Sequence, residues 1–130
     1  MMRVLVYYNA KTDAGKRLRR VIEATPLKSR VEYHETISGL IDTLTRPANA
    51  WGISVLLPTN REDLEQLTAI GEFLKTLRII LVLPDNSRDT ISKGHALSPR
   101  CLMFAHGCLE NVGAVLKKMT ASFGLHPPFS

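Results

Sequence analysis

The sequence predicts an α/β protein in which helices cover both faces of a doubly wound, parallel, five-stranded sheet. Residues 51–58 and 79–83 are uncharged runs rich in β-favouring residues, and a proline ends each of them. Short apolar runs of this kind are typical of strands buried on both faces of a parallel sheet. Amphipathic helical segments alternate with the predicted strands along the chain, which favours right-handed β–α–β connections.

Length and composition fit one globular domain. The chain has 130 residues, of which 45% are hydrophobic and 22% charged, so it can bury one core but not two. No apolar run reaches the roughly 20 residues of a membrane span, and the N-terminal segment lacks the apolar stretch of a signal peptide. We therefore expect a cytoplasmic protein with a single domain at residues 1–122 and a C-terminal tail at residues 123–130.

The first half of the chain predicts two strand–helix pairs. Residues 3–8 form the first strand, and Asp13 is placed to cap a helix that Pro26 ends. Residues 30–35 alternate between polar and apolar side chains, as a half-exposed edge strand does. A short amphipathic helix follows this strand, and Arg46 and Pro47 close it.

The second half predicts three more pairs around the central strand. Residues 59–62 carry the capping-box pattern, and one long helix is expected to run from there to Leu77. A short, weakly patterned helix is expected at 90–97, and a fifth strand at 101–105. The last helix contains Gly113, which we expect to weaken it.

Five strand–helix pairs in strict alternation predict a flavodoxin-like (βα)5 sheet with the strand order 2-1-3-4-5. Ligands and chemistry of such sheets gather just beyond the carboxyl ends of the strands. A functional site is therefore expected among the residues at these ends.

The order and spacing of the elements over residues 3–120 resemble the receiver domain of response regulators in two-component signalling. The resemblance implies a magnesium-binding acidic pair, a phosphorylated aspartate, a hydroxyl residue and a lysine at the ends of four strands. In this chain the acidic pair falls on Tyr8 and Asn9, the aspartate on Leu57 or Pro58, the hydroxyl on Leu83 and the lysine on Ala105.

None of these residues can perform the phosphorylation chemistry of the family. Magnesium prefers carboxylate oxygens and water, and neither leucine nor proline accepts a phosphoryl group. The resemblance therefore implies a degenerate pseudo-receiver that binds no metal or cofactor and is not an enzyme. Such a domain is expected to act in signal transduction through contacts with a partner protein.

A flavodoxin-like enzyme or small-ligand-binding protein is the alternative. It would use Tyr8, Asn9, Thr59, Asp85 and His106 at the strand ends. Residues 9–16 are the candidate phosphate loop, but they contain one glycine and lack the GxGxxG pattern. No spacing such as HExxH supports a metal site.

Basic residues are concentrated at the start of the chain. Residues 1–30 hold eight basic side chains against two acidic ones, a local charge of +6, whereas the whole chain carries +5. The cluster Lys16, Arg17, Arg19 and Arg20 is either a solvated helix face or a surface for an acidic protein partner. The absence of interleaved aromatic residues and of a helix-turn-helix pattern argues against nucleic acid.

The predicted fifth strand has no charge, although it is an edge of the sheet in the expected order. An exposed apolar edge strand tends to pair with another chain unless other elements cover it. Either the flanking helices provide it within one chain, or a homodimer forms through the fourth helix, the fifth strand and the fifth helix. The dimer would bury Leu97, Met103 or Phe104.

Overall fold

The computed structural model describes residues 3–27, 30–45 and 51–125. Five parallel strands form one sheet in the order β2-β1-β3-β4-β5, so the predicted fold class and strand order are confirmed. The strands are β1 Arg3–Tyr7, β2 Arg30–His34, β3 Trp51–Leu56, β4 Arg78–Leu83 and β5 Cys101–Phe104. The helices are α1 Asp13–Ala24, α2 Ile37–Leu44, α3 Arg61–Ala69, α4 Gly71–Leu74, α5 Arg88–His95 and α6 Glu110–Leu125.

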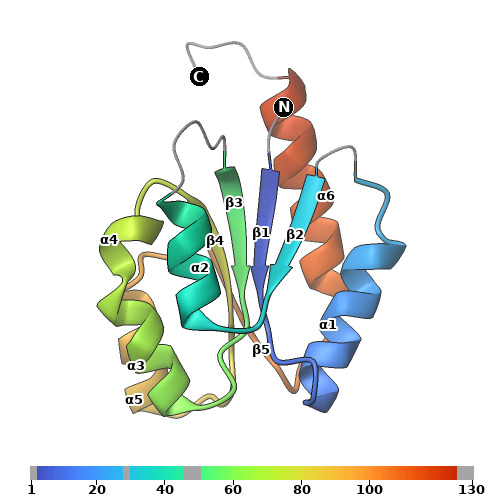
Figure 1. The fold of residues 1–130 in the computed structure, drawn as a ribbon. Coiled ribbons are helices and arrows are strands. Elements are labelled where there is room, and N and C mark those ends of the chain that lie inside the picture. Colours follow the sequence, from blue (N-terminus) through green and yellow to red (C-terminus); the bar gives the residue numbers. More distant parts are fainter. Residues whose placement is uncertain (1–2, 28–29, 46–50, 126–130) are drawn as a thin grey trace.

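The helices divide between the two faces of the sheet (Figure 1). Helices α1 and α6 cover one face, where Leu18 and Leu116 pack against inward side chains such as Val6. Helices α2, α3, α4 and α5 lie on the other face, where Leu40 and Leu64 belong to a second buried cluster. Successive strand residues alternate between the two clusters, because side chains on a strand point to opposite faces.

The buried polar group of the central strand is Ser54, whose neighbours in register are Leu5 and Ile79. Its hydroxyl oxygen is inaccessible to solvent and has no hydrogen-bond partner. An unpaired buried hydroxyl costs on the order of 1–3 kcal/mol. The face covered by α2–α5 therefore holds one unsatisfied polar group inside an otherwise apolar cluster.

Two helix caps differ from the sequence prediction by one residue. Thr12, and not Asp13, caps α1, because its hydroxyl accepts a hydrogen bond from the backbone of Gly15 at 2.9 Å. Asn60 caps α3 and accepts from the backbone N–H of Asp63 at 2.8 Å. The Asp63 carboxylate accepts from the N–H of Thr59, the residue before the cap, so the cap lies one position later than expected and the carboxylate reaches one residue beyond it.

The long helix predicted between residues 59 and 77 is divided in two. Its apolar residues are buried as expected, but Ile70 leaves the helical conformation at φ −102°, ψ 19°, and α4 begins at Gly71. Glycine is a poor helix former, so the backbone breaks where it is least stabilised. The apolar period alone could not reveal this break.

Other boundaries shift by a few residues. Helix α5 begins at Arg88, two residues earlier than predicted, because Ser87 caps it. Helix α6 continues to Leu125, so residues 123–125, assigned to a tail, are helical. The expected helix closure at Arg46 and Pro47 and the remaining tail residues lie outside the described residues. The division into a domain and a tail stays a prediction.

Gly113 has a packing role that the sequence did not indicate. A Cβ atom at this position would lie 2.5 Å from Thr25 Oγ1 and 3.1 Å from Val21 Cγ1 of α1. Glycine thus allows α6 to approach α1 closely. The residue expected to weaken the last helix therefore lies where that helix packs against α1. Within the described residues, no helix is long and apolar enough to cross a membrane.

Candidate functional site

The positions expected at the strand ends lie along one edge of the sheet. Tyr7 of β1 is in register with Leu56 of β3, and Leu83 of β4 with Phe104 of β5, so the residues that follow these strands are neighbours. Of the receiver-like switch positions, Tyr8 is 3% exposed and Leu83 fully buried, and Pro58 is buried as well. Ala105 is half-buried and its backbone N–H donates to the carbonyl of Leu83 at 2.8 Å.

Tyr8 belongs to a cluster of two tyrosines and an arginine. Arg19 Nη1 donates to the Tyr8 hydroxyl at 2.6 Å, and the guanidinium carbon lies 4.3 Å from the ring centroid of Tyr33. The two tyrosine rings meet edge to face at 5.5 Å. Hydrogen bonds to Tyr8 and then to Glu23 raise the pKa of Arg19. Tyr8 occupies the position that the resemblance assigns to a magnesium-binding carboxylate, and a cation and a second aromatic ring lie against it.

The loop after β1 is a tight turn. The Asn9 side-chain oxygen accepts from the backbone N–H of Lys11 at 2.9 Å. The main-chain carbonyl oxygen of Asn9 accepts from the Thr12 hydroxyl at 2.8 Å. A Cβ atom on Gly15 would lie 1.9 Å from the Asn9 carbonyl oxygen, so only glycine fits this approach. These contacts account for the single glycine of the candidate phosphate loop without a phosphate.

A polar cavity of about 290 Å³ opens at the same edge. Asn9 and Thr59 line it, whereas Tyr8, Asp85 and His106 do not, so the five residues of the ligand-binding alternative do not share one cavity. The remaining lining residues are Tyr7, Glu35, Asn60, Glu62, Asp63 and Gln66. In the described part of the chain, no group of three or more histidine, cysteine or acidic side chains is placed to hold a metal ion.

Neutral donors hold two carboxylates of this cavity. The Tyr7 hydroxyl donates to Asp63 Oδ1 at 2.5 Å, and the backbone N–H of Ala10 donates to Glu35 at 3.1 Å. Burial first, and then the hydrogen bond to Asp63, raises the pKa of Tyr7 well above its ordinary value. The hydroxyl therefore stays protonated and continues to donate at neutral pH.

Asp85 and His106 have separate local roles. The Asp85 carboxylate accepts from the backbone N–H of Ser87 at 2.9 Å, and this bond is the main reason that its pKa is lowered. The His106 ring is tilted against Phe104, with the two centroids 5.8 Å apart. Asp85 thus shapes the turn before α5, and His106 packs on the end of β5.

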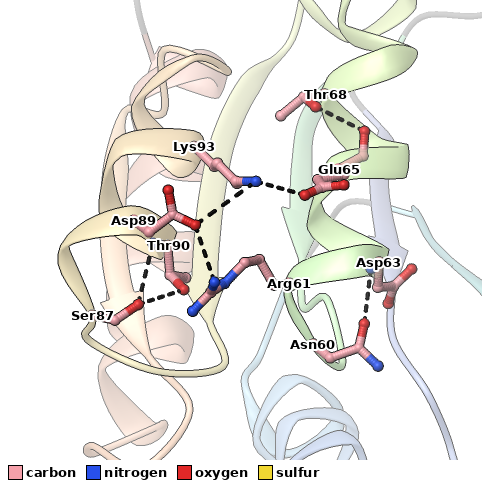
Figure 2. A network of polar contacts seen from close by, with 9 residues as sticks. All are labelled: Asn60, Arg61, Asp63, Glu65, Thr68, Ser87, Asp89, Thr90 and Lys93. Carbon is pink, nitrogen blue, oxygen red and sulfur yellow. Dashed lines mark hydrogen bonds and ion pairs between the residues drawn. The ribbon is translucent and has the colours of Figure 1, made fainter.

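Helices α3 and α5 are joined by charged side chains (Figure 2). Arg61 of α3 lies 3.1 Å from Asp89 of α5, and Lys93 of α5 contacts Glu65 of α3 at 2.5 Å. Lys93 also lies 3.8 Å from Asp89, so the four residues form one network. The sequence reasoning missed this network, although Arg61 and Glu65, like Asp89 and Lys93, are four residues apart and could have indicated it.

The four residues of the predicted basic cluster differ in their surroundings. Lys16 and Arg20 are exposed on α1. Arg17 reaches the loop before α6, where its Nη2 lies 3.4 Å from the carbonyl oxygen of Gly107. Arg19 is engaged by Tyr8, Tyr33 and Glu23, as described above. Neighbouring side chains therefore hold Arg19 in place, whereas Lys16, Arg17 and Arg20 are more accessible to a partner.

The three residues of the candidate dimer interface do not lie together. Leu97 is only 7% exposed and packs in the cluster under α2–α5, so it has little surface left for a partner. Met103 packs against the opposite cluster, on the side of α1 and α6, because alternate residues of β5 face opposite sides. Phe104 is half-buried and packs against the same cluster as Leu97. Of the three residues, Leu97 has the least exposed surface.

Comparison with known proteins gives structural neighbours only. No family model matches the chain, and no curated protein matches its sequence. A proposed pilus assembly-related protein from Burkholderia pseudomallei is 18% identical with a TM-score of 0.67, over 93% of this chain and 90% of that one. A proposed pilus assembly protein from Burkholderia thailandensis is 18% identical with a TM-score of 0.66, over 94% and 99%.

A CheY-like receiver domain from Methanospirillum hungatei is 9% identical with a TM-score of 0.68, over 94% of this chain and 96% of that one. The chain therefore has the fold of response-regulator receiver domains, as the sequence predicted.

Proposed function

We propose that this chain is a pseudo-receiver: a non-catalytic regulatory domain that acts through protein–protein contacts and is not phosphorylated on an aspartate. The observation that carries the proposal is the composition of the strand-end edge. Tyr8, Pro58 and Leu83 are buried there, at positions where the resemblance expects a metal ligand, the phosphorylated aspartate and a hydroxyl. Aspartyl phosphorylation needs an acceptor carboxylate and a cation that neutralises the developing charge.

The neighbouring structures support this proposal and suggest its setting. Both Burkholderia proteins are described as pilus assembly proteins, and their sequences are closer to this chain than that of the archaeal receiver domain. We therefore propose that the domain binds a protein of a comparable assembly or signalling machinery on the cytoplasmic side of the membrane.

Incubation of the intact chain with acetyl phosphate and Mg²⁺, followed by intact-mass and peptide mass spectrometry, tests the lack of phosphorylation. The expected result is an unchanged mass, whereas a receiver domain with a complete acidic site gains one phosphoryl group in a parallel reaction. A stable phosphoryl adduct on any aspartate of this chain would overturn the proposal. Asp63, which lies in the polar cavity, is the residue to inspect first.

A homodimer through the β5 edge also stays a proposal, now narrowed to Met103 and Phe104, since Leu97 is buried within the chain. Sedimentation equilibrium at increasing concentration tests it. We expect a dimer for the wild-type chain and a monomer for Phe104→Lys, with circular dichroism to establish that the variant folds. A wild-type chain that remains monomeric at high micromolar concentration contradicts the dimer.

A further inference from the structure

A groove of about 380 Å³ lies between α1 and α6, next to their close contact at Gly113. Val21 and Thr25, the two residues that limit the space at Gly113, also line the groove. Ala24 adds exposed apolar surface, and Leu109, only 1% exposed, forms part of the floor. The close approach of the two helices thus leaves a partly apolar hollow beside it.

The charged side chains of the groove are mostly cationic. Arg17 and Arg20 line it, and within the described residues neither forms an ion pair. Glu110 is the one carboxylate of the lining, and it accepts a hydrogen bond from the Cys108 thiol at 3.0 Å. That bond is the main cause of its lowered pKa, to which the charge of Arg17 adds. The two guanidiniums therefore exceed the local negative charge.

We propose that this groove binds an acidic amphipathic helix of a partner protein. The inference rests on the proposed function and adds the chemistry of the partner. An amphipathic helix places apolar side chains in a groove and its flanking residues at the borders. Carboxylates at those flanking positions would pair with Arg17 and Arg20, and complementary charge both speeds association and selects the partner. The +6 charge of residues 1–30 extends this attraction beyond the groove.

The lining favours a polypeptide over nucleic acid. Single-stranded nucleic acid is bound by stacking bases on aromatic side chains and by cations along the backbone. Among the described residues, no aromatic side chain lines the groove, and Val21 and Ala24 offer nothing to a phosphate. These apolar side chains gain free energy only by contact with another apolar surface.

Three fluorescent probes separate these occupants: a helix-forming peptide with leucines at positions i, i+4 and i+7 flanked by glutamates, a scrambled peptide of the same composition, and a single-stranded oligonucleotide. Binding to the intact chain is measured by fluorescence anisotropy without a phosphodonor. We expect the helical peptide to bind more tightly than both others, and less tightly as salt is added. Absent binding of the helical peptide, equal binding of both peptides, or tighter binding of the oligonucleotide overturns the proposal.

Two variants then localise the binding. Reversing both guanidiniums (Arg17→Glu with Arg20→Glu) should weaken the helical peptide about tenfold or more. The matched control is Lys75→Glu with Arg88→Glu, which reverses two exposed cations, at the end of α4 and on α5, on the other face of the sheet and should leave binding unchanged. An equal loss in the control would show that net charge alone drives binding, against the proposal.

Ala24→Lys is the sharper test. Ala24 is exposed at the end of α1, where a cation is favourable, so the variant should fold. It adds positive charge to the groove, and its long side chain fills the hollow that the apolar side chains of the peptide would enter. Groove docking predicts weaker binding of the helical peptide, whereas simple charge attraction predicts stronger binding, which would overturn the proposal. A chain that fails these tests and still resists acetyl phosphate contradicts the groove assignment alone and not the pseudo-receiver.

Discussion

The helices on the two faces of the sheet differ in how many of their charged side chains form ion pairs. Across the α3–α5 surface, Arg61 pairs with Asp89, and Lys93 with both Glu65 and Asp89. On α1 only Arg19 has a carboxylate partner, whereas Arg17 and Arg20 have none in the described part of the chain. Paired charges cancel each other's field at a distance, and unpaired ones do not. The contrast gives α1 a stronger positive field than α3 and α5, whose charged side chains pair with one another.

The two layers also differ in how closely their helices pack. A side chain on Gly113 would collide with α1, whereas a Cβ on Gly71 would meet only Leu97 Cδ2, at an ordinary contact distance of 3.8 Å. Glycine is thus required where α6 meets α1, but it is dispensable where α4 begins. Substitution of each glycine measures this difference directly.

Gly113→Val should give the largest change in stability. The branched side chain must push α6 away from Thr25 and Val21, and overpacking of this kind costs about 1–3 kcal/mol. Urea unfolding followed by circular dichroism measures the loss. The matched control, Gly71→Ala, should leave the free energy of unfolding unchanged or raise it by about 0.4–1 kcal/mol. Equal effects of the two substitutions would contradict the packing difference between the layers.

Arg19→Ala should give a smaller loss of stability than Gly113→Val. It tests whether Arg19 stabilises the fold more than the other residues of the basic cluster. Loss of the stacking on Tyr33 and of the hydrogen bond to Tyr8 should lower the free energy of unfolding by about 0.5–1 kcal/mol. Arg20→Ala, on the same helix, should change it by less than about 0.5 kcal/mol, because Arg20 is exposed. Thermal unfolding of both variants measures the difference. If Arg20 proves as important to stability as Arg19, the division of the cluster is wrong.

The sequence predicted the sheet well because the strands follow simple rules. The uncharged runs at β3 and β4 and the alternation at β2 specify central and edge positions, and alternation with helices leaves few topologies. Finer features escaped because they depend on competition between neighbours. Thr12 and Asp13 are both good caps, and only the folded backbone shows that Thr12 is used. The break at Ile70 likewise depends on Gly71 next to it.

For the candidate site, the sequence indicated positions in the chain but not the contacts made there. Comparison of strand ends with the receiver pattern identified Tyr8, Pro58 and Leu83 as positions without a carboxylate or hydroxyl suited to that chemistry. The α1–α6 groove was not predictable, because its lining comes from two segments about ninety residues apart in the sequence. The burial of Leu97 was missed for the same reason, since its neighbour Gly71 lies at the start of α4, a separate segment of the chain.

The position of α6 after the other helices and strands has a consequence for synthesis on the ribosome. Leu109, Val112 and Leu116 complete the cluster that α1 shares with the central strands. The layer formed by α2–α5 can close before α6 has left the exit tunnel, since every residue of its cluster precedes Leu109. A nascent chain must therefore present Val4, Val6 and Val55 on a face that α1 covers only in part until α6 has left the tunnel. During that interval this face is the natural target for chaperones, and the finished helix α6 ends the exposure.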